Sequence, residues 1–220
     1  MIYAIGDIHG CFYTLRNLLN RLPYTGEDTM IFLGDYIDRG YYSKDVLDLL
    51  IEMYYFNTCI FCKGNHEDML QNVLDNKPYS NDTFFYNGGL ATISSFGKGG
   101  LKSLMAEEKY TTFLSNLVLS HETDDYIFVH AGLGQSPPYI NSTDSLWVRN
   151  KFIQYDYSFL KKKIIFGHTP FNEPLILKDK IGIDTGCIFE GKLTCLILPE
   201  EKFVSVPLSK RDLVKTSYYD

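Results

Sequence analysis

The first 76 residues repeat one pattern of hydrophobic and polar positions three times. Each time, a short continuous apolar run is followed by a polar segment that contains glycine, and then by apolar residues at helical spacing. Short continuous apolar runs are typical of strands covered on both faces, and strands that alternate with helices predict a parallel βαβ arrangement. The predicted elements are strand 2–5, helix 11–22, strand 29–33, a helix from Ser43 to Met53, strand 58–62 and helix 66–76.

The pattern changes after residue 76. Glycines and aromatic residues divide residues 77–124 into short pieces that we predict to be helical. We expect this insertion to pack as a helical layer; the alternative is that it shapes access to a site. Strands are predicted again at 126–129 and 163–166, and we expect the β-type runs that follow to form antiparallel hairpins closing a second sheet. These later runs are 174–177, 181–183, 193–198 and 203–206. Residues 208–220 have little pattern and are expected to form a loosely attached tail.

The composition indicates one soluble globular domain over residues 1–220. Hydrophobic residues make up 45% of the chain, and 17 Tyr and 15 Phe argue against disorder. The net charge of −6, without a long basic run, argues against nucleic acid as a partner. Met1 leads directly into a predicted strand, and no apolar stretch approaches the roughly 20 residues of a membrane span. We therefore expect a cytoplasmic protein without a membrane partner, and we make no prediction of its oligomeric state.

The five cysteines are odd in number and lack the spacing of a disulfide framework. Cys59 and Cys62 form a C-x-x-C, but in a strand, positions three apart point to opposite faces. We therefore predict core thiols rather than a zinc or redox site. Cys11, which lies beside a candidate ligand, is interpreted as a buried inert thiol, with oxidation sensitivity as the alternative.

Polar side chains of the metal-ligand type follow five of the predicted strands. Segment 34–40, Gly-Asp-Tyr-Ile-Asp-Arg-Gly, has two carboxylates and a guanidinium directly after an apolar run. Ligands bind at the carboxyl ends of strands in open α/β sheets, so these loops can converge in space. Carboxylates and imidazoles brought together would repel and lose hydration unless a cation lay among them. We therefore infer bound metal, although a single His9, His130 or His168 would more often be a structural histidine.

Five motifs occur in the following order: G-D-x-H-G at 6–10, G-D-x-x-D-R-G at 34–40, G-N-H-E at 64–67, H-A-G at 130–132 and G-H-T-P at 167–170. With these motifs, the chain resembles the calcineurin-like metallophosphoesterases and, more narrowly, the phosphoprotein phosphatase family. Leu-Trp-Val-Arg at 146–149 and Ile-Asp-Thr-Gly at 183–186 are most similar to the bacterial and phage branch of that family. This branch includes the phage lambda phosphatase type and the bacterial diadenosine tetraphosphatases. One motif alone would be weak evidence, but five in order are specific.

The resemblance implies an α/β fold in which two mixed β-sheets pack together, with helices outside and a dimetal centre at the loop edge. Asp7 and His9 would bind the first metal, and Asp35 would bridge the two. The implied ligands that complete the second metal are Asn65, His130 and His168. Mixed nitrogen and oxygen ligands suit Mn²⁺, with Fe or Zn²⁺ as alternatives, and a shared carboxylate suits two ions roughly 3.5–4 Å apart.

The mechanism that the resemblance implies is in-line attack on a phosphomonoester by a hydroxide that bridges the two metals. His66 would protonate the leaving alkoxide, and Asp38 would fix the tautomer of His66 and raise its pKa. Arg39 and Arg149 would hold the phosphoryl oxygens by forked hydrogen bonds, with Asn65 as a further contact to the phosphate.

Simpler interpretations exist for several of these residues. Asp38 and Arg39 could form a surface ion pair. Arg149, which rests on the Trp-Val-Arg context alone, could be a solvated arginine. Glu67 could simply favour the start of a helix. Asp184 could contact a ligand histidine or only shape a turn.

We predict a metal-dependent serine/threonine protein phosphatase, whose partner is a phosphoprotein or phosphopeptide. The alternative is a hydrolase of dinucleoside polyphosphates such as diadenosine tetraphosphate, because the same metals could catalyse this hydrolysis. A nucleoside pocket would need aromatic stacking and further basic residues in 77–124 or 133–148. A third hypothesis, a catalytically silent metal-binding protein, is disfavoured because ligands, acid and phosphate clamp all have candidates.

Overall fold

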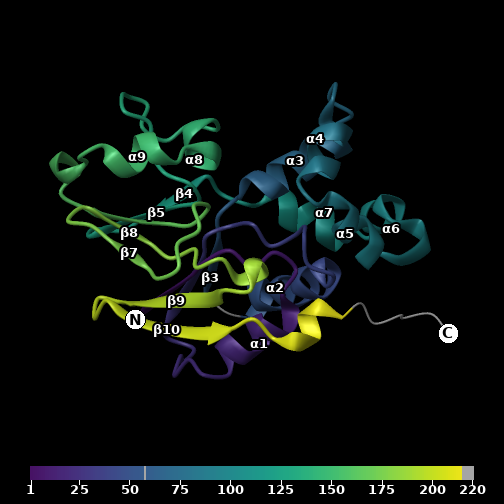
Figure 1. Cartoon of the computed structure of the whole chain (residues 1–220), viewed down its shortest axis with the longest axis horizontal. Helices are drawn as coiled ribbons and strands as arrows, with labels where there is room; N and C mark the ends of the chain where they lie inside the picture. The colour runs from purple at the N-terminus through teal and green to yellow at the C-terminus, as the bar shows by residue number, and fades with distance from the viewer. Residues whose placement is uncertain (57, 215–220) are drawn as a thin grey trace.

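The computed structural model describes residues 1–56 and 58–214. Two five-stranded sheets form its centre, and helices lie outside them (Figure 1). Both sheets contain parallel and antiparallel pairs. The predicted α/β fold of two packed mixed sheets is therefore confirmed.

The first sheet consists of β1 (Ile2–Ile5), β2 (Thr29–Phe32), β3 (Cys59–Phe61), β9 (Lys192–Leu198) and β10 (Lys202–Pro207). Its strand order is β10-β9-β1-β2-β3. The strands β1, β2 and β3 are parallel, with Ile2 opposite Thr29 and Met30 opposite Cys59. The predicted βαβ arrangement of the first part of the chain is thus confirmed.

The second sheet consists of β4 (Ser120–Glu122), β5 (Tyr126–Val129), β6 (Lys163–Phe166), β7 (Leu175–Ile176) and β8 (Lys180–Gly182). Its strand order is β4-β5-β6-β8-β7. The strands β5, β6 and β8 are parallel, and β4 and β7 pair antiparallel at the two edges.

The α-helices are α1 (Phe12–Leu19), α2 (Ser43–Phe56), α3 (Asn65–Leu74), α4 (Ser80–Tyr86), α5 (Gly89–Ser95), α6 (Leu101–Ala106), α7 (Glu108–Ser115), α8 (Asp144–Trp147) and α9 (Asn150–Gln154). The 3-10 helices are η1 (Gly97–Gly99), η2 (Ser158–Leu160), η3 (Cys187–Phe189) and η4 (Lys210–Leu213). Segment 77–124 contains helices as predicted, but it ends in strand β4, which the sequence pattern did not indicate. Within the described ranges, no helix combines the length and the apolar character needed to cross a membrane.

The position of the last hairpin differs from the prediction. We expected all the late β-type runs to close the second sheet, and this is wrong for β9 and β10, which join the first sheet beside β1. Without β9, the strand β1 would be an edge strand although three of its four residues are buried. The six buried residues from 193 to 198 in β9 cover this edge and pair its backbone groups.

The core follows from the alternation of side chains along the strands. Ala4 packs between the two sheets in one cluster with Phe128. The next residue, Ile5, points the other way and belongs to the cluster that contains Leu15 of α1. Phe152 of α9 belongs to a third cluster on the outer face of the second sheet. The layers are thus helix, sheet, sheet and helix, as Figure 1 shows.

The cysteines behave as the strand geometry predicts. All five are free thiols, and Cys59 and Cys62 belong to different core clusters because their side chains leave the chain on opposite faces. Burial raises the pKa of Cys62 to about 12, which leaves the thiol protonated and unreactive. Cys11 is also fully buried, in agreement with the inert interpretation.

Residues 209–214 are attached to α1. The carboxylate of Asp212 is buried and accepts hydrogen bonds from the backbone N–H groups of Tyr13 and Thr14, both at 2.9 Å. These N–H groups lie in the first turn of α1 and have no partner within the helix, so the carboxylate stabilises the start of α1. The expectation of a loose tail is therefore wrong for this part, and residues 215–220 lie outside the described residues.

Candidate active site

The loops that follow β1, β2, β3, β5 and β6 meet at one place, at the carboxyl ends of the parallel strands of both sheets. Backbone hydrogen bonds join them: the N–H of His9 donates to the carbonyl of Asp35 at 2.8 Å, and the N–H of Gly167 donates to that of His130 at 2.7 Å. The sequence could not show this convergence directly, because the loops come from two different sheets.

Several candidate residues have left-handed backbone conformations, which strain residues other than glycine. They are His9 (φ 47°), Asp35 (φ 53°), Asp38 (φ 71°), Arg39 (φ 68°) and His168 (φ 61°). Gly64 allows a close approach of two loops, because a Cβ at this position would collide with the Asp35 carboxylate and backbone. The motif glycines thus permit the side chains of neighbouring loops to lie in contact.

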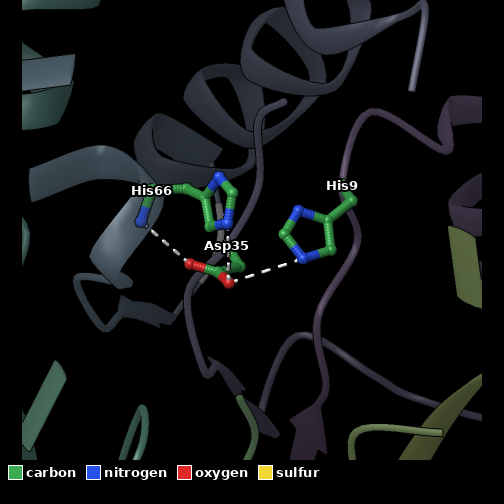
Figure 2. A group of neighbouring side chains, drawn as sticks. All are labelled: His9, Asp35 and His66. Carbon is green, nitrogen blue, oxygen red and sulfur yellow. Dashed lines mark hydrogen bonds and ion pairs between the residues drawn. The ribbon is translucent and has the colours of Figure 1, made fainter. Parts of the chain in front are cut away.

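Asp35 is the centre of a first group of side chains, which it forms with His9 and His66 (Figure 2). Its Oδ2 lies 3.4 Å from His9 Nε2 and 3.9 Å from His66 Nε2. The backbone N–H of His66 donates to Asp35 Oδ1 at 3.2 Å. All three side chains are buried, so these polar atoms are shielded from bulk water.

Asp35 also belongs to a second group, with His130 and His168. Its Oδ1 lies 3.4 Å from His130 Nε2, and that nitrogen is 3.2 Å from His168 Nδ1 and 3.0 Å from Asn65 Oδ1. Asp35 is thus the residue that the two groups share, and its role as a ligand that bridges two metals stays a prediction.

The hydrogen bonds of the histidines determine which nitrogen atoms face the site. His9 Nδ1 lies 3.0 Å from the carbonyl of Ile37, and His130 Nδ1 lies 2.8 Å from the carbonyl of Leu33. A carbonyl only accepts, so each Nδ1 carries the hydrogen and each Nε2 presents a lone pair towards Asp35. His168 Nε2 is buried without a hydrogen-bond partner among the described residues. Lone pairs of nitrogen and oxygen that converge in this way fit divalent cations.

The charges of the site point to the same conclusion. Burial alone would raise the pKa of Asp35, but the surrounding imidazoles, above all His130, hold it well below its usual range. Burial, together with the nearby carboxylates of Asp184 and Asp35, raises the pKa of Asp7 well above its usual range. Burial also raises the pKa of Asp184, to about 6. Bound cations would relieve the repulsion among these buried carboxylates.

Asp7 and Asp184 lie beside the two groups without belonging to either. The Asp7 carboxylate accepts a hydrogen bond from the backbone N–H of His168, at 3.0 Å to Oδ2 and 3.2 Å to Oδ1. Asp184 Oδ1 accepts the N–H of Gly186 at 3.0 Å, so its carboxylate shapes a turn. This hydrogen bond to Gly186 supports the interpretation of Asp184 as a residue that shapes a turn.

His66 is held by a buried hydrogen-bond chain. Its Nδ1 lies 2.7 Å from Asp38 Oδ2, and the Thr92 hydroxyl of α5 donates to Asp38 Oδ1 at 2.6 Å. Burial alone would lower the pKa of His66, but Asp35 and Asp38 raise it above its usual value. Asp38 is completely buried, so its interpretation as a surface ion pair with Arg39 is wrong. Thr92 was missed because no motif marks it and 54 residues separate it from Asp38.

Both candidate phosphate-binding arginines reach the site. Arg39 Nη1 donates to His9 Nε2 at 2.6 Å, and Arg149 Nη1 donates to the carbonyl of His168 at 2.7 Å. Arg149 is therefore not free in solvent, although much of its residue surface is exposed.

Glu67 has a larger role than the start of a helix. It is 1% exposed, and its carboxylate accepts backbone hydrogen bonds from Asp35 at 2.9 Å, from Tyr36 at 2.8 Å and from Gly64 at 3.0 Å. These contacts fasten the loop after β2 to the start of α3, which carries Asn65 and His66. A signal existed in the sequence, since Glu at the third position of a helix often bonds back to the N-cap backbone.

Replacing Glu67 by glutamine is expected to lower the free energy of unfolding by about 1–3 kcal/mol, because an amide offers fewer acceptors to the buried N–H groups. Chemical denaturation of the two proteins measures this difference. Glu108→Gln, in the exposed first turn of α7, is the matched control and should change stability much less. Equal stability of Glu67→Gln and the unmodified chain would contradict this role.

Comparison with known proteins gives three findings. The sequence model of the calcineurin-like phosphoesterase family matches residues 1–196. The chain is 30% identical to the asymmetrical bis(5'-nucleosyl)-tetraphosphatase PrpE of Anoxybacillus flavithermus, with 94% of each chain covered. It is 27% identical to the protein of the same name from Halalkalibacterium halodurans, with 97% of this chain and 96% of the relative covered.

Solved structures share the fold at lower identity. A crystal structure provisionally assigned as a diadenosine tetraphosphatase superimposes with a TM-score of 0.66 at 21% identity, with 94% of this chain and 92% of that chain covered. A serine/threonine protein phosphatase of Saccharomyces cerevisiae superimposes with a TM-score of 0.59 at 15% identity, with 94% and 79% covered. At these identities, the likeness concerns the fold alone.

The prediction of a serine/threonine protein phosphatase acting on phosphoproteins is wrong. The relatives that match nearly end to end are named for hydrolysis of dinucleoside tetraphosphates, which was the alternative hypothesis. The physical reason for the error is that the motif residues surround the metals and the phosphate. They are the same whatever group carries the phosphate, so they cannot distinguish a protein from a dinucleotide.

Proposed function

This chain belongs to the calcineurin-like phosphoesterase family, and from that premise we propose that it hydrolyses dinucleoside tetraphosphates, such as diadenosine tetraphosphate, into unequal halves. One water molecule would cleave one phosphoanhydride bond and yield a nucleoside triphosphate and a nucleoside monophosphate. The observation that carries the proposal is the similarity, over more than nine tenths of the chain, to tetraphosphatases described as asymmetrical.

The side chains around Asp35 fit a pair of divalent metal ions, because they offer unprotonated nitrogen and carboxylate oxygen atoms in a buried place. We propose that Asp7, His9 and Asp35 hold one ion, and that Asp35 holds the other with the three remaining ligands, Asn65, His130 and His168. We propose Mn²⁺ as the metal, with Fe or Zn²⁺ as alternatives, because mixed nitrogen and oxygen ligands suit these ions. When bound, such ions polarise the phosphate and lower the pKa of a bound water.

The remaining residues handle the substrate and its proton. His66 would hold a proton at Nε2, close to Asp35, while Asp38 keeps the hydrogen of Nδ1 fixed. That proton would go to the phosphate oxygen of the departing nucleotide. Arg39 and Arg149 carry permanent positive charge and would bind oxygens of the phosphate chain. Asn65 would hold the phosphate as well as a metal.

Incubation with diadenosine tetraphosphate and Mn²⁺, followed by separation of the nucleotides, tests the function. We expect ATP and AMP in equal amounts and no reaction after chelation of divalent metal. Two molecules of ADP per substrate would contradict asymmetric cleavage. A higher kcat/KM for phosphoserine peptides than for the dinucleotide would contradict the proposed substrate class.

Replacing Thr92 by valine is expected to lower kcat roughly tenfold for phosphate esters with poor leaving groups, because Asp38 loses a buried hydrogen-bond donor and positions His66 less well. KM and metal content should stay close to those of the unmodified chain. Thr92→Ser keeps the hydroxyl and serves as the control that should restore the rate. A similar loss in the serine variant, or loss of metal from the valine variant, would show that Thr92 acts through packing alone.

A further inference from the structure

Two exposed aromatic side chains lie beside the site, one next to each group of candidate metal ligands. Phe189, in η3, is 60% exposed, and its ring centroid lies 5.3 Å from the Arg39 guanidinium carbon. Arg39 in turn contacts His9. Trp147, at the end of α8, is 42% exposed, and its ring meets the His168 ring edge to face at 6.2 Å.

The two rings are carried by different parts of the fold. Phe189 is the last residue of η3 and Trp147 is the last residue of α8. In Figure 1, the yellow-green turn that contains η3 precedes β9, and α8 lies beside the second sheet. The turn with Phe189 is closed by hydrogen bonds from the N–H groups of Phe189 (2.9 Å) and Gly191 (3.0 Å) to the carbonyl of Gly186. The turn therefore holds Phe189 in a defined place although its ring is exposed.

Positive charge lies near each end of this arrangement. The guanidinium of Arg39 lies over the ring of Phe189, and Arg149 follows Trp147 by two residues and bonds to the carbonyl of His168. Contacts therefore lead from Phe189 through Arg39 to His9 in the first group, and from His168 in the second group to Trp147, with Arg149 at the His168 carbonyl. A dinucleoside tetraphosphate has the complementary order of aromatic base, polyanion and aromatic base.

We propose that Phe189 and Trp147 are the two platforms on which the bases of a dinucleoside tetraphosphate stack, with the phosphate chain lying across the candidate metal ligands between them. This inference rests on the proposed function and deepens it. Stacking uses the π-face that every base has, so the site would accept different nucleosides. Substrates that lack one or both bases would lose these contacts and bind more weakly.

Steady-state kinetics of Phe189→Ala and Trp147→Ala tests the platforms. For diadenosine tetraphosphate, each variant is expected to raise KM roughly tenfold, in line with the typical strength of base stacking on an aromatic side chain. With inorganic tetraphosphate, which has no bases, the rise should be clearly smaller. Phe189→Tyr keeps a ring and should restore the KM. Phe159→Ala is the matched control, since Phe159 is 50% exposed on η2 and packs against Tyr139.

Trp147 is the only tryptophan of the chain, so its fluorescence reports binding directly in the unmodified protein. A methylene-bridged analogue of diadenosine tetraphosphate, which resists hydrolysis, is expected to quench this fluorescence, whereas inorganic tetraphosphate should not. An unchanged KM in both alanine variants, or no quenching by the analogue, would contradict the stacking of the bases on these two rings. Formation of ATP and AMP by the unmodified chain would still support the proposed function in that case. If the unmodified chain does not hydrolyse the dinucleotide, the proposed function falls and the platforms fall with it.

Discussion

Asp35→Asn is expected to lower the rate of diadenosine tetraphosphate hydrolysis by roughly 10³-fold or more, because one carboxylate serves both groups of candidate metal ligands. Its two oxygens face His9 and His66 on one side and His130 on the other. Asparagine keeps the shape, but it removes the negative charge that two cations would need at the shared position. The loss should therefore include metal affinity as well as rate.

Two measurements separate these effects. Metal content after gel filtration reports affinity, and kcat at saturating Mn²⁺ reports the rate of the loaded protein. Asp124→Asn, in the exposed turn before β5, is the control and should behave like the unmodified chain. Retention of more than about a tenth of the activity, at any metal concentration, would contradict the central position of Asp35.

His66→Asn is expected to cause the second largest loss of hydrolysis rate, and the size of this loss should depend on the leaving group. General acids typically contribute roughly 10²–10⁴-fold. A nucleotide that leaves from a phosphoanhydride is already a stable anion at neutral pH. We therefore expect the loss of rate for the dinucleotide to lie near the lower end of this range. An alkyl phosphate releases a strongly basic alkoxide, and its hydrolysis should fall towards the upper end.

The metal content of His66→Asn distinguishes two roles. His66 belongs to one of the groups that could hold an ion, although Asp38 occupies its Nδ1 and its Nε2 lies 3.9 Å from Asp35. As a proton donor, it can be replaced without loss of metal. Equal losses for the dinucleotide and for alkyl phosphates, together with a loss of bound metal, would identify His66 as a ligand and exclude the acid role.

The family and the main features of the fold could be predicted because their signals are local. Strands of continuous apolar residues, followed by glycine and polar residues, marked the loops with Asp35, His130 and His168, and the resemblance to calcineurin-like phosphoesterases is confirmed. The place of β9 and β10 could not be predicted in the same way. An apolar strand pattern indicates burial, but it does not indicate which sheet edge the strand will cover.

Residues that act through long-range contacts were also beyond local patterns. Thr92 reaches Asp38 from a helix that carries no recognisable motif, and only the folded chain brings the two together. The substrate was predicted wrongly for a related reason. The motifs describe atoms that are expected to touch metals and phosphate, while we propose that other side chains, Phe189 and Trp147, contact the rest of the substrate.

The pairing of β1 with β9 has a consequence for how the chain reaches its folded state. β1 carries the first motif loop, yet its partner strand ends at Leu198, so the two segments are almost the whole chain apart. During synthesis, β1 can pair with β2 early, but its other edge stays uncovered until β9, Lys192–Leu198, has left the ribosome. A nascent or truncated chain that stops before β9 would expose the unpaired backbone N–H and C=O groups of β1, to which another chain could pair. We expect such fragments to aggregate or to be degraded rather than to show partial activity.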